Sequence, residues 1–283
     1  MGGIGVVMNW LRGILYGFIS GISEFLPISA QAHERIFLFF FGQTERDPVM
    51  ALLIHIAALL ALLSGARVQL EQIRRERALK KRSRRQATNP TFNSLADLRF
   101  VKNASWPMAC CILLLRYIVK VHLSMPVIAV MLLLNGVALF LPSRMISGNK
   151  NAGKMSLLDS ILVGLCGSAC VVPGLSGIGF VIAATLIRGA DRKHVKNWVI
   201  LLMIPSLGIQ ILTDIIDIFA GIGNPAGFGG FFAYLLAALF AYVSARVAIY
   251  LLGRMLQNNT ISFFAYYSWG AALFAFLLYL SAV

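Results

Sequence analysis

Long apolar stretches constrain the fold of this chain more than any other feature. Six of them reach or approach the roughly 20 residues that a helix needs to cross a bilayer. They lie at residues 47–65, 105–120, 124–142, 197–219, 226–251 and 261–282. Only 13% of the 283 residues are charged and 59% are hydrophobic, which excludes a water-soluble globule. The sequence therefore predicts an all-α, polytopic membrane protein with about six spanning helices, the second of them short.

Two further apolar regions are interrupted and do not read as simple spans. Residues 4–41 contain Pro27 among several polar residues, and residues 157–187 contain the break Pro173-Gly174. We expect each region to form a helix, a broken loop and a second helix. Such backbone is tolerated at membrane depth only where protein or water covers it. Both regions are predicted to be re-entrant hairpins, although a simple proline kink in a span is the alternative.

Basic residues set the predicted topology. Between Arg67 and Arg85 there are nine Lys or Arg and two Glu, so the loop 66–104 is expected to be cytoplasmic. This rule explains the net charge of +14 better than nucleic-acid binding does. Counting spans outward places one hairpin and three spans in each half of a single integral membrane domain. The halves 1–142 and 157–283, joined by a cytoplasmic linker at 143–156, are thus predicted to be inverted repeats whose breaks meet near the midplane.

The two breaks are predicted to form an anion site. The chain can restart as a helix at Ser29 after the first break and at Ser176 after the second. Each helix start carries unpaired N–H groups and a partial positive charge, which suits phosphate. Gly174, Gly177 and Gly179 would let the backbone approach this ligand closely. Helix packing is the alternative role for these glycines.

Glu24 and His33 are the candidate catalytic residues near the first break. An acid at this depth is costly and marks function by default. Glu24 is expected to bind a divalent cation or act as a general base, with an ion pair to Arg35 as the structural alternative. His33 follows Ser29 by four residues and would share its helix face. We expect His33 to serve as an acid, base or nucleophile, or else as a hydrogen-bonded structural residue.

Other polar residues within the apolar segments are interpreted structurally. His55, Asn135 and Arg246 are expected to make polar contacts between helices. Asp214 and Asp217 are one turn apart and are expected to lie at a solvated helix end rather than in a weak metal site.

Several of these residues occur in a familiar arrangement. The stretch from Gly21 to Ser29 with His33, and the stretch Pro173-Gly174-Leu175-Ser176 with Gly179, resemble two signatures of the undecaprenyl pyrophosphate phosphatase family, the bacitracin-resistance membrane proteins. Residues 189–192 and 261–263 resemble later segments of that family. The resemblance implies a multi-pass enzyme of the bacterial inner membrane that removes the terminal phosphate of undecaprenyl diphosphate. It also implies a divalent cation, Mg²⁺ or Ca²⁺, as cofactor.

Residue by residue, the resemblance assigns roles and reveals departures. Glu24 matches the second acid of the first signature, a metal ligand. Ser29 matches its first serine and His33 its histidine, and Ser176 matches the first serine of the second signature. Four further family positions are changed: an acid to Ser20, a serine to Ala30, an arginine to Gly177 and a serine to Ile178. Losing the arginine removes a donor that would neutralise a diphosphate.

Three functions are therefore expected, and whether the chain is an enzyme is left open. The first is hydrolysis of a polyprenyl diphosphate lipid carrier. The second is non-catalytic binding or flipping of a polyprenyl phosphate, which the lost motif residues favour. The third is transport of a small ion at Glu24. The predicted partners are the lipid and the bilayer, without nucleic acid, and self-association is left open.

Overall fold

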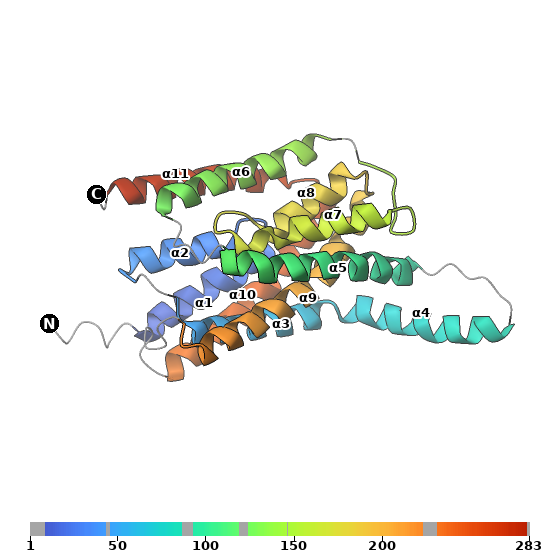
Figure 1. The fold of residues 1–283 in the computed structure, drawn as a ribbon, viewed down its shortest axis with the longest axis horizontal. Helices are drawn as coiled ribbons and strands as arrows, with labels where there is room; N and C mark the ends of the chain where they lie inside the picture. The colour runs from blue at the N-terminus through green and yellow to red at the C-terminus, as the bar shows by residue number, and fades with distance from the viewer. Residues whose placement is uncertain are drawn as a thin grey trace.

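The computed structural model describes residues 9–43, 46–86, 93–118, 124–145, 147–222 and 231–281. These residues form α-helices joined by short turns, with no β-strand among them (Figure 1). The helices are α1 (Asn9–Phe25), α2 (Ala30–Phe40), α3 (Pro48–Gly65), α4 (Arg67–Gln86), α5 (Asn93–Ile118), α6 (Met125–Arg144), α7 (Leu157–Gly167), the 3₁₀ turn η1 (Ser168–Val171), α8 (Gly177–Ile187), α9 (Arg192–Phe219), α10 (Phe231–Gln257) and α11 (Ser262–Leu280).

Six helices are long and apolar enough to cross a membrane, which confirms the predicted spans. They are α3, α5, α6, α9, α10 and α11. The ends of the predicted segments at residues 4–8, 119–120, 226–230 and 282 lie outside the described residues. The second span is not short: the candidate span is Ser94–Arg116, with 23 residues, and it begins before residue 105. The polar start of α5 can be helical because the buried Asp97 accepts a hydrogen bond from the Trp198 Nε1–H at 2.7 Å.

Both interrupted regions consist of a helix, a break and a second helix, as the sequence predicts. In the first, α1 ends at Phe25 and α2 begins after Ser29, whose side chain accepts from the backbone N–H of Ala32. In the second, α7 and η1 precede the break and α8 begins after Ser176, whose side chain accepts from Gly179 N–H. That each pair of helices returns to its own membrane face stays a prediction.

Small residues bring α1 against α10 along their length. Gly13, Gly17 and Gly21 repeat every four residues on α1 and face the buried residues Ala233, Ala237 and Ala241 of α10. A Cβ at Gly17 would lie only 2.1 Å from the Ala237 carbonyl oxygen. Such close backbone approach is the usual basis of helix association in lipid. It fixes the N-terminal hairpin, and with it Glu24, to the second half of the chain.

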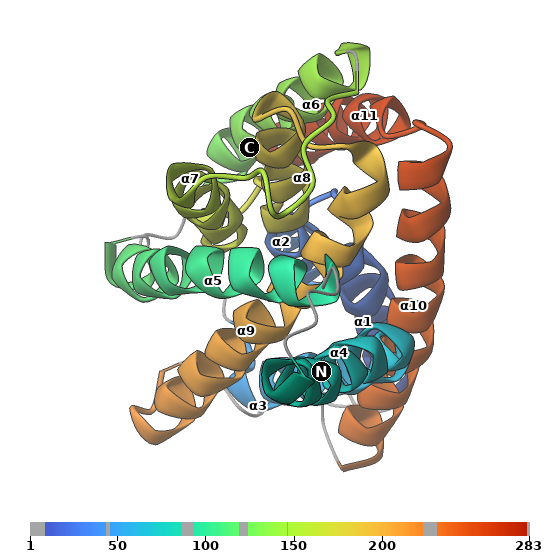
Figure 2. The ribbon, with the colours of Figure 1, turned by 90° about the vertical axis from the view of Figure 1, so that its right-hand side faces the viewer.

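The basic segment predicted as a loop contains the helix α4. It continues from α3 after Ala66 and extends past the end of the bundle (Figure 1). Seen end-on, α5 lies on the left of the molecule and α10 on the right, and α3 packs against both α9 and α10 (Figure 2).

Candidate functional site

The two breaks meet inside the protein. The Gly174 backbone N–H donates to Ser29 Oγ at 3.0 Å, so the tip of one helix pair touches the tip of the other. Gly174 has a φ of +103°, and an added Cβ would lie 2.4 Å from the Met131 Cβ. Glycine is therefore required here both for its backbone conformation and for close packing on α6. Ser29 also has positive φ, at 68°.

Asn135 of α6 joins both breaks from the side. Its Nδ2 donates to the Pro27 carbonyl at 3.1 Å and to Ser268 Oγ at 3.0 Å. Its Oδ1 accepts from the Ser176 backbone N–H at 2.9 Å. Asn135 has no exposed surface, so water cannot hydrogen-bond its amide and these protein partners must do so. The predicted contact between helices is present and involves four elements of the fold.

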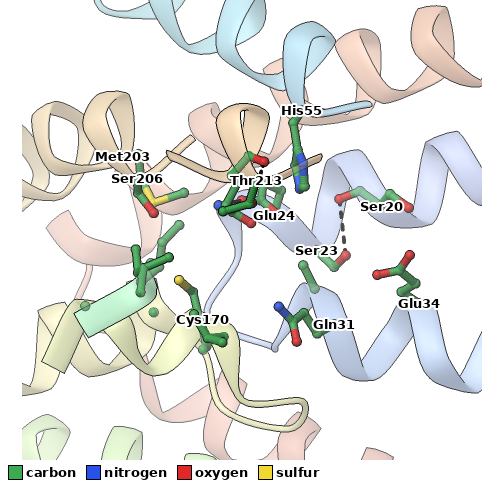
Figure 3. Close-up of a pocket in the computed structure, with 18 of the residues that line it drawn as sticks. Ser20, Ser23, Glu24, Gln31, Glu34, His55, Cys170, Met203, Ser206 and Thr213 are labelled. Atoms are coloured by element: carbon green, nitrogen blue, oxygen red, sulfur yellow. Dashed lines mark hydrogen bonds between the residues drawn. The ribbon is translucent and has the colours of Figure 1, made fainter. Parts of the chain in front are cut away.

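A cavity lies beside the meeting point, between α1, α2, α3, α5, α8 and α9. It offers about 80 Å³ to the centres of water-sized molecules, several times what one water needs. Its lining includes Glu24, Ser176 and Gly177 from the predicted site. Figure 3 shows Glu24 near the middle of this lining, with His55 above it. Within the described part of the chain, Glu24 Oε1 accepts a hydrogen bond from Gln210 Nε2 at 3.3 Å.

A chain of charged and polar side chains lines the same cavity. Tyr16 Oη donates to Glu34 at 2.5 Å, and Arg46 contacts Glu34 through Nε at 2.9 Å. Arg46 Nη1 then contacts Asp214 at 3.1 Å, and the other Asp214 oxygen lies 2.5 Å from His55 Nδ1. Asp214 is only 1% exposed, which makes Arg46 and His55 its compensating partners.

Asp214 and Asp217 do not form a solvated helix end. Asp214 is buried in the cavity wall, and Asp217 is ion-paired with Arg116 of α5. Arg116 also donates to the Thr213 carbonyl at 3.3 Å and lines the cavity. The prediction was wrong because it did not place cations opposite the two acids; Arg46 and Arg116 come from distant parts of the sequence.

Ser29, His33, Gly174 and Gly179 lie outside the cavity lining. The Ser29 hydroxyl accepts from two backbone N–H groups at the tips. His33 is on another side of α2, where Nδ1 lies 2.8 Å from the Ser29 carbonyl and Nε2 lies 2.7 Å from Tyr267 Oη. Glu24 and His33, which were expected to act together, are thus not brought into one cavity.

Gly177 has no room for a side chain. An added Cβ would lie 2.7 Å from the Gly167 carbonyl oxygen and 2.8 Å from the Cys170 Cβ. The position that matches an arginine in the resembling family is therefore filled by the backbone of η1 and α7. Any cation of this site must come from elsewhere, and Arg46 and Arg116 are the arginines in the described lining.

Sequence reasoning missed Arg46, Arg116, Gln210 and the role of Asp214. One signal was available. Asp214 lies within the mainly apolar segment 211–216, and acids within spans mark functional or paired positions. Arg46 precedes the Asp47-Pro48 start of α3, where nothing in the sequence distinguishes a site residue from a loop cation.

Comparison with known proteins agrees with the resemblance. Residues 13–274 match the family model described as bacitracin resistance protein BacA. The undecaprenyl-diphosphatase of Carboxydothermus hydrogenoformans is 26% identical over 93% of this chain and 94% of its own length. That of Methanobrevibacter smithii is 28% identical, over 95% and 98%. That of Desulfosudis oleivorans is 28% identical, over 92% and 95%. The chain therefore belongs to the bacitracin resistance protein BacA family.

Proposed function

We propose that this membrane protein binds the headgroup of a polyprenyl diphosphate in the cavity at Glu24 and hydrolyses its terminal phosphate. One observation carries the proposal: an acid, a histidine–aspartate pair, two arginines and the start of α8 all line one cavity. The undecaprenyl-diphosphatases similar to this chain supply the substrate class.

In the proposed reaction, a water oxygen forms a bond to the terminal phosphorus while the bond from that phosphorus to the bridging oxygen breaks. The products are the lipid monophosphate and inorganic phosphate. His55 takes the proton of the water, since its Nδ1 is held by Asp214 and its Nε2 is the nitrogen left for proton transfer. Arg46 and Arg116 neutralise the oxygens of the diphosphate. The first N–H groups of α8, at Gly177 and Ile178, stabilise charge on the transferred phosphate.

A divalent cation fits this cavity in one form only. Among the described residues, no three His, Cys, Asp or Glu side chains are grouped to hold a metal ion. A cage of protein ligands such as Ca²⁺ prefers is therefore not supported there. Mg²⁺ is commonly held by one or two carboxylates together with substrate phosphates, and Glu24, which accepts from the Gln210 amide nitrogen, offers one such carboxylate. When bound, Mg²⁺ would neutralise phosphate charge.

Ser29 and His33 are proposed to position the site. Ser29 joins the two tips, and His33 holds the Ser29 carbonyl and Tyr267. Their family-derived catalytic roles remain predictions, and the experiment below tests that of His33.

A second function is favoured by the charges of the cavity. The carboxylates of Glu34 and Asp214 already pair with Arg46, and Arg116 pairs with Asp217. A diphosphate must compete with these pairs, whereas a monophosphate needs less neutralisation. The second proposal is therefore a non-catalytic binder or flippase of a polyprenyl phosphate that retains the family fold.

We further propose that the protein lies in the bacterial inner membrane with α4 on the cytoplasmic side. The density of Lys and Arg in α4 supports this orientation, because loops rich in these residues remain in the cytoplasm. The test introduces a cysteine at the exposed Val68 and adds a thiol reagent that does not cross membranes. Labelling is compared between intact and permeabilised cells, and we expect it only after permeabilisation. Labelling in intact cells would show the opposite orientation.

The test of hydrolysis uses the purified full chain in detergent with farnesyl diphosphate and Mg²⁺ or Ca²⁺. Phosphate release is measured for the wild type and for Glu24→Gln, His55→Ala and His33→Ala. Thr185→Val, a buried α8 position whose hydroxyl bonds only its own helix, is the folding control. We expect Glu24→Gln and His55→Ala to lose a hundredfold or more of the activity. His33→Ala should lose less than His55→Ala.

If the wild type releases no more phosphate than the double variant Glu24→Gln/His55→Ala, the proposal of hydrolysis is wrong. A liposome assay for movement of a polyprenyl monophosphate between leaflets then tests the second proposal. If His33→Ala is the most damaging single change, the assignment of proton transfer to His55 is wrong.

A further inference from the structure

A second hollow lies between α4 and α5, away from the cavity at Glu24. Its lining consists of Arg77, Lys80 and Lys81 from α4 and Leu95, Ala96, Leu98, Arg99 and Lys102 from α5. It offers about 680 Å³ to the centres of water-sized molecules and shares no residue with the first cavity. Figure 1 shows that this region is at the end of the bundle, where α4 extends past the spanning helices. We name it the α4–α5 groove.

The five cations of the groove have no acidic partner among the described residues. Glu71 pairs with Arg75 at 3.8 Å, outside the lining. The Glu76 carboxylate instead accepts from the backbone N–H groups of Ser94 and Leu95, at 3.2 and 3.0 Å.

The third nearby acid is also occupied. Asp97 is buried and accepts from Trp198. None of the five lining cations takes part in an ion pair within the part of the chain that the structure describes. The groove therefore concentrates positive charge that the fold itself does not neutralise.

The groove has an apolar wall at the level where a spanning helix begins. Leu95, Ala96 and Leu98 lie in the first turns of α5, at the start of the candidate span Ser94–Arg116. A soluble anion would use the cations and leave this wall unoccupied. A phospholipid would use both, because its phosphate meets Lys and Arg while its chains lie against leucine.

From this combination we infer that the α4–α5 groove binds the phosphate headgroup of an anionic phospholipid, with the start of its acyl chains against Leu95 and Leu98. The site is independent of the proposed hydrolysis, since no lining residue is shared. It goes beyond the topological role of α4, because orientation alone does not require the cations to converge on one hollow.

The experiment measures lipid binding to the full chain in detergent by native mass spectrometry. The added compounds are dioctanoyl phosphatidylglycerol, dioctanoyl phosphatidylcholine and inorganic phosphate. The groove variant is Arg99→Gln/Lys102→Gln, and both side chains are exposed. The matched control is Arg74→Gln/Arg75→Gln, which removes two charges from exposed positions of α4 outside the lining.

We expect the wild type to prefer phosphatidylglycerol over phosphatidylcholine. A basic residue near an anionic lipid surface is worth roughly fivefold in affinity, so the groove variant should bind phosphatidylglycerol about thirty-fold more weakly. The control should change the affinity by less than threefold. If Arg99→Gln/Lys102→Gln does not fold, Lys80→Gln/Lys81→Gln tests the other wall of the groove.

Equal losses in the groove variant and the control would overturn the inference, since binding would then follow total charge. Competition by inorganic phosphate at the concentration of the lipid would also overturn it and indicate a soluble anion. Equal affinity for phosphatidylcholine would show that the cations do not select the headgroup.

Discussion

Asn135 offers the most direct test of how the two breaks are held together. We expect Asn135→Leu, a substitution by a residue of similar size, to destabilise the protein by about 3–5 kcal/mol, from lost hydrogen bonds and one unpaired N–H. Three hydrogen bonds between elements are lost, to Pro27, Ser268 and Ser176. Such bonds average about 0.6 kcal/mol each in membrane proteins, which gives about 2 kcal/mol. The unpaired N–H of Ser176, buried with its residue, adds roughly 1–3 kcal/mol.

The assay is unfolding of the full chain in mixed micelles with increasing denaturing detergent. Thr185→Val is the matched control, because Thr185 is equally buried and, within the described residues, its hydroxyl bonds Val181 and Ile182 of its own helix. The control should cost less than about 1 kcal/mol, since no contact between elements is lost. If the two variants are destabilised equally, Asn135 does not clamp the breaks, and the tips are held by packing alone.

Three further changes probe other parts of the molecule. Gly177→Arg should not raise phosphate release and should lower the yield of folded protein, because its Cβ would lie 2.7 Å from the Gly167 carbonyl oxygen; higher release would show that the backbone yields there. Arg46→Gln should lower phosphate release about a hundredfold, as loss of a transition-state donor does, with Arg46→Lys retaining part of the rate; unchanged release would exclude Arg46 from substrate binding. Burial alone would raise the pKa of the Asp159 carboxyl, but a backbone N–H and Arg188 hold that pKa below its usual value. The pKa of Asp159 is lower in the folded state than in the unfolded state, so this stabilisation is present above about pH 5 and is lost as the pH falls through the folded pKa. The difference in free energy of unfolding between the wild type and Asp159→Asn should therefore become smaller in acid.

The spanning helices could be predicted because apolar length is a local property of the sequence. The start of α5 was missed for the opposite reason. Residues 94–104 carry Asp97, Arg99 and Lys102, and their helical state depends on partners such as Trp198, about 100 positions away. A polar helix end stabilised by a distant side chain leaves no signal in a hydropathy count.

The candidate site also combines residues that are visible locally in the sequence with residues that depend on distant contacts. Glu24 and Ser176, which both line the cavity, could be singled out because an acid in an apolar segment and a restarting helix are visible in a few consecutive letters. Arg46 and His55 required knowledge of which helices pack together. The acid between them, Asp214, belongs to α9 and meets a loop and α3 only in the folded chain. Its depth in an apolar helix was the available warning, and reading it as an exposed helix end ignored the cost of that burial.

The hydrogen bonds at the tips explain why matching a signature does not fix the role of its residues. Ser29 is the family serine by position, yet its hydroxyl already accepts from Ala32 and Gly174. Its hydroxyl hydrogen could still be donated to a phosphate, but Ser29 is buried and lies outside the cavity lining, so a ligand in the cavity does not contact it. In the cavity, the described contact of Glu24 is a weak amide hydrogen bond at 3.3 Å, and Arg46 and Arg116 can exchange their carboxylate partners for phosphate oxygens. The chemistry of this chain is therefore expected beside the meeting point, where side chains are free to exchange partners, and not at the tips, where they maintain the fold.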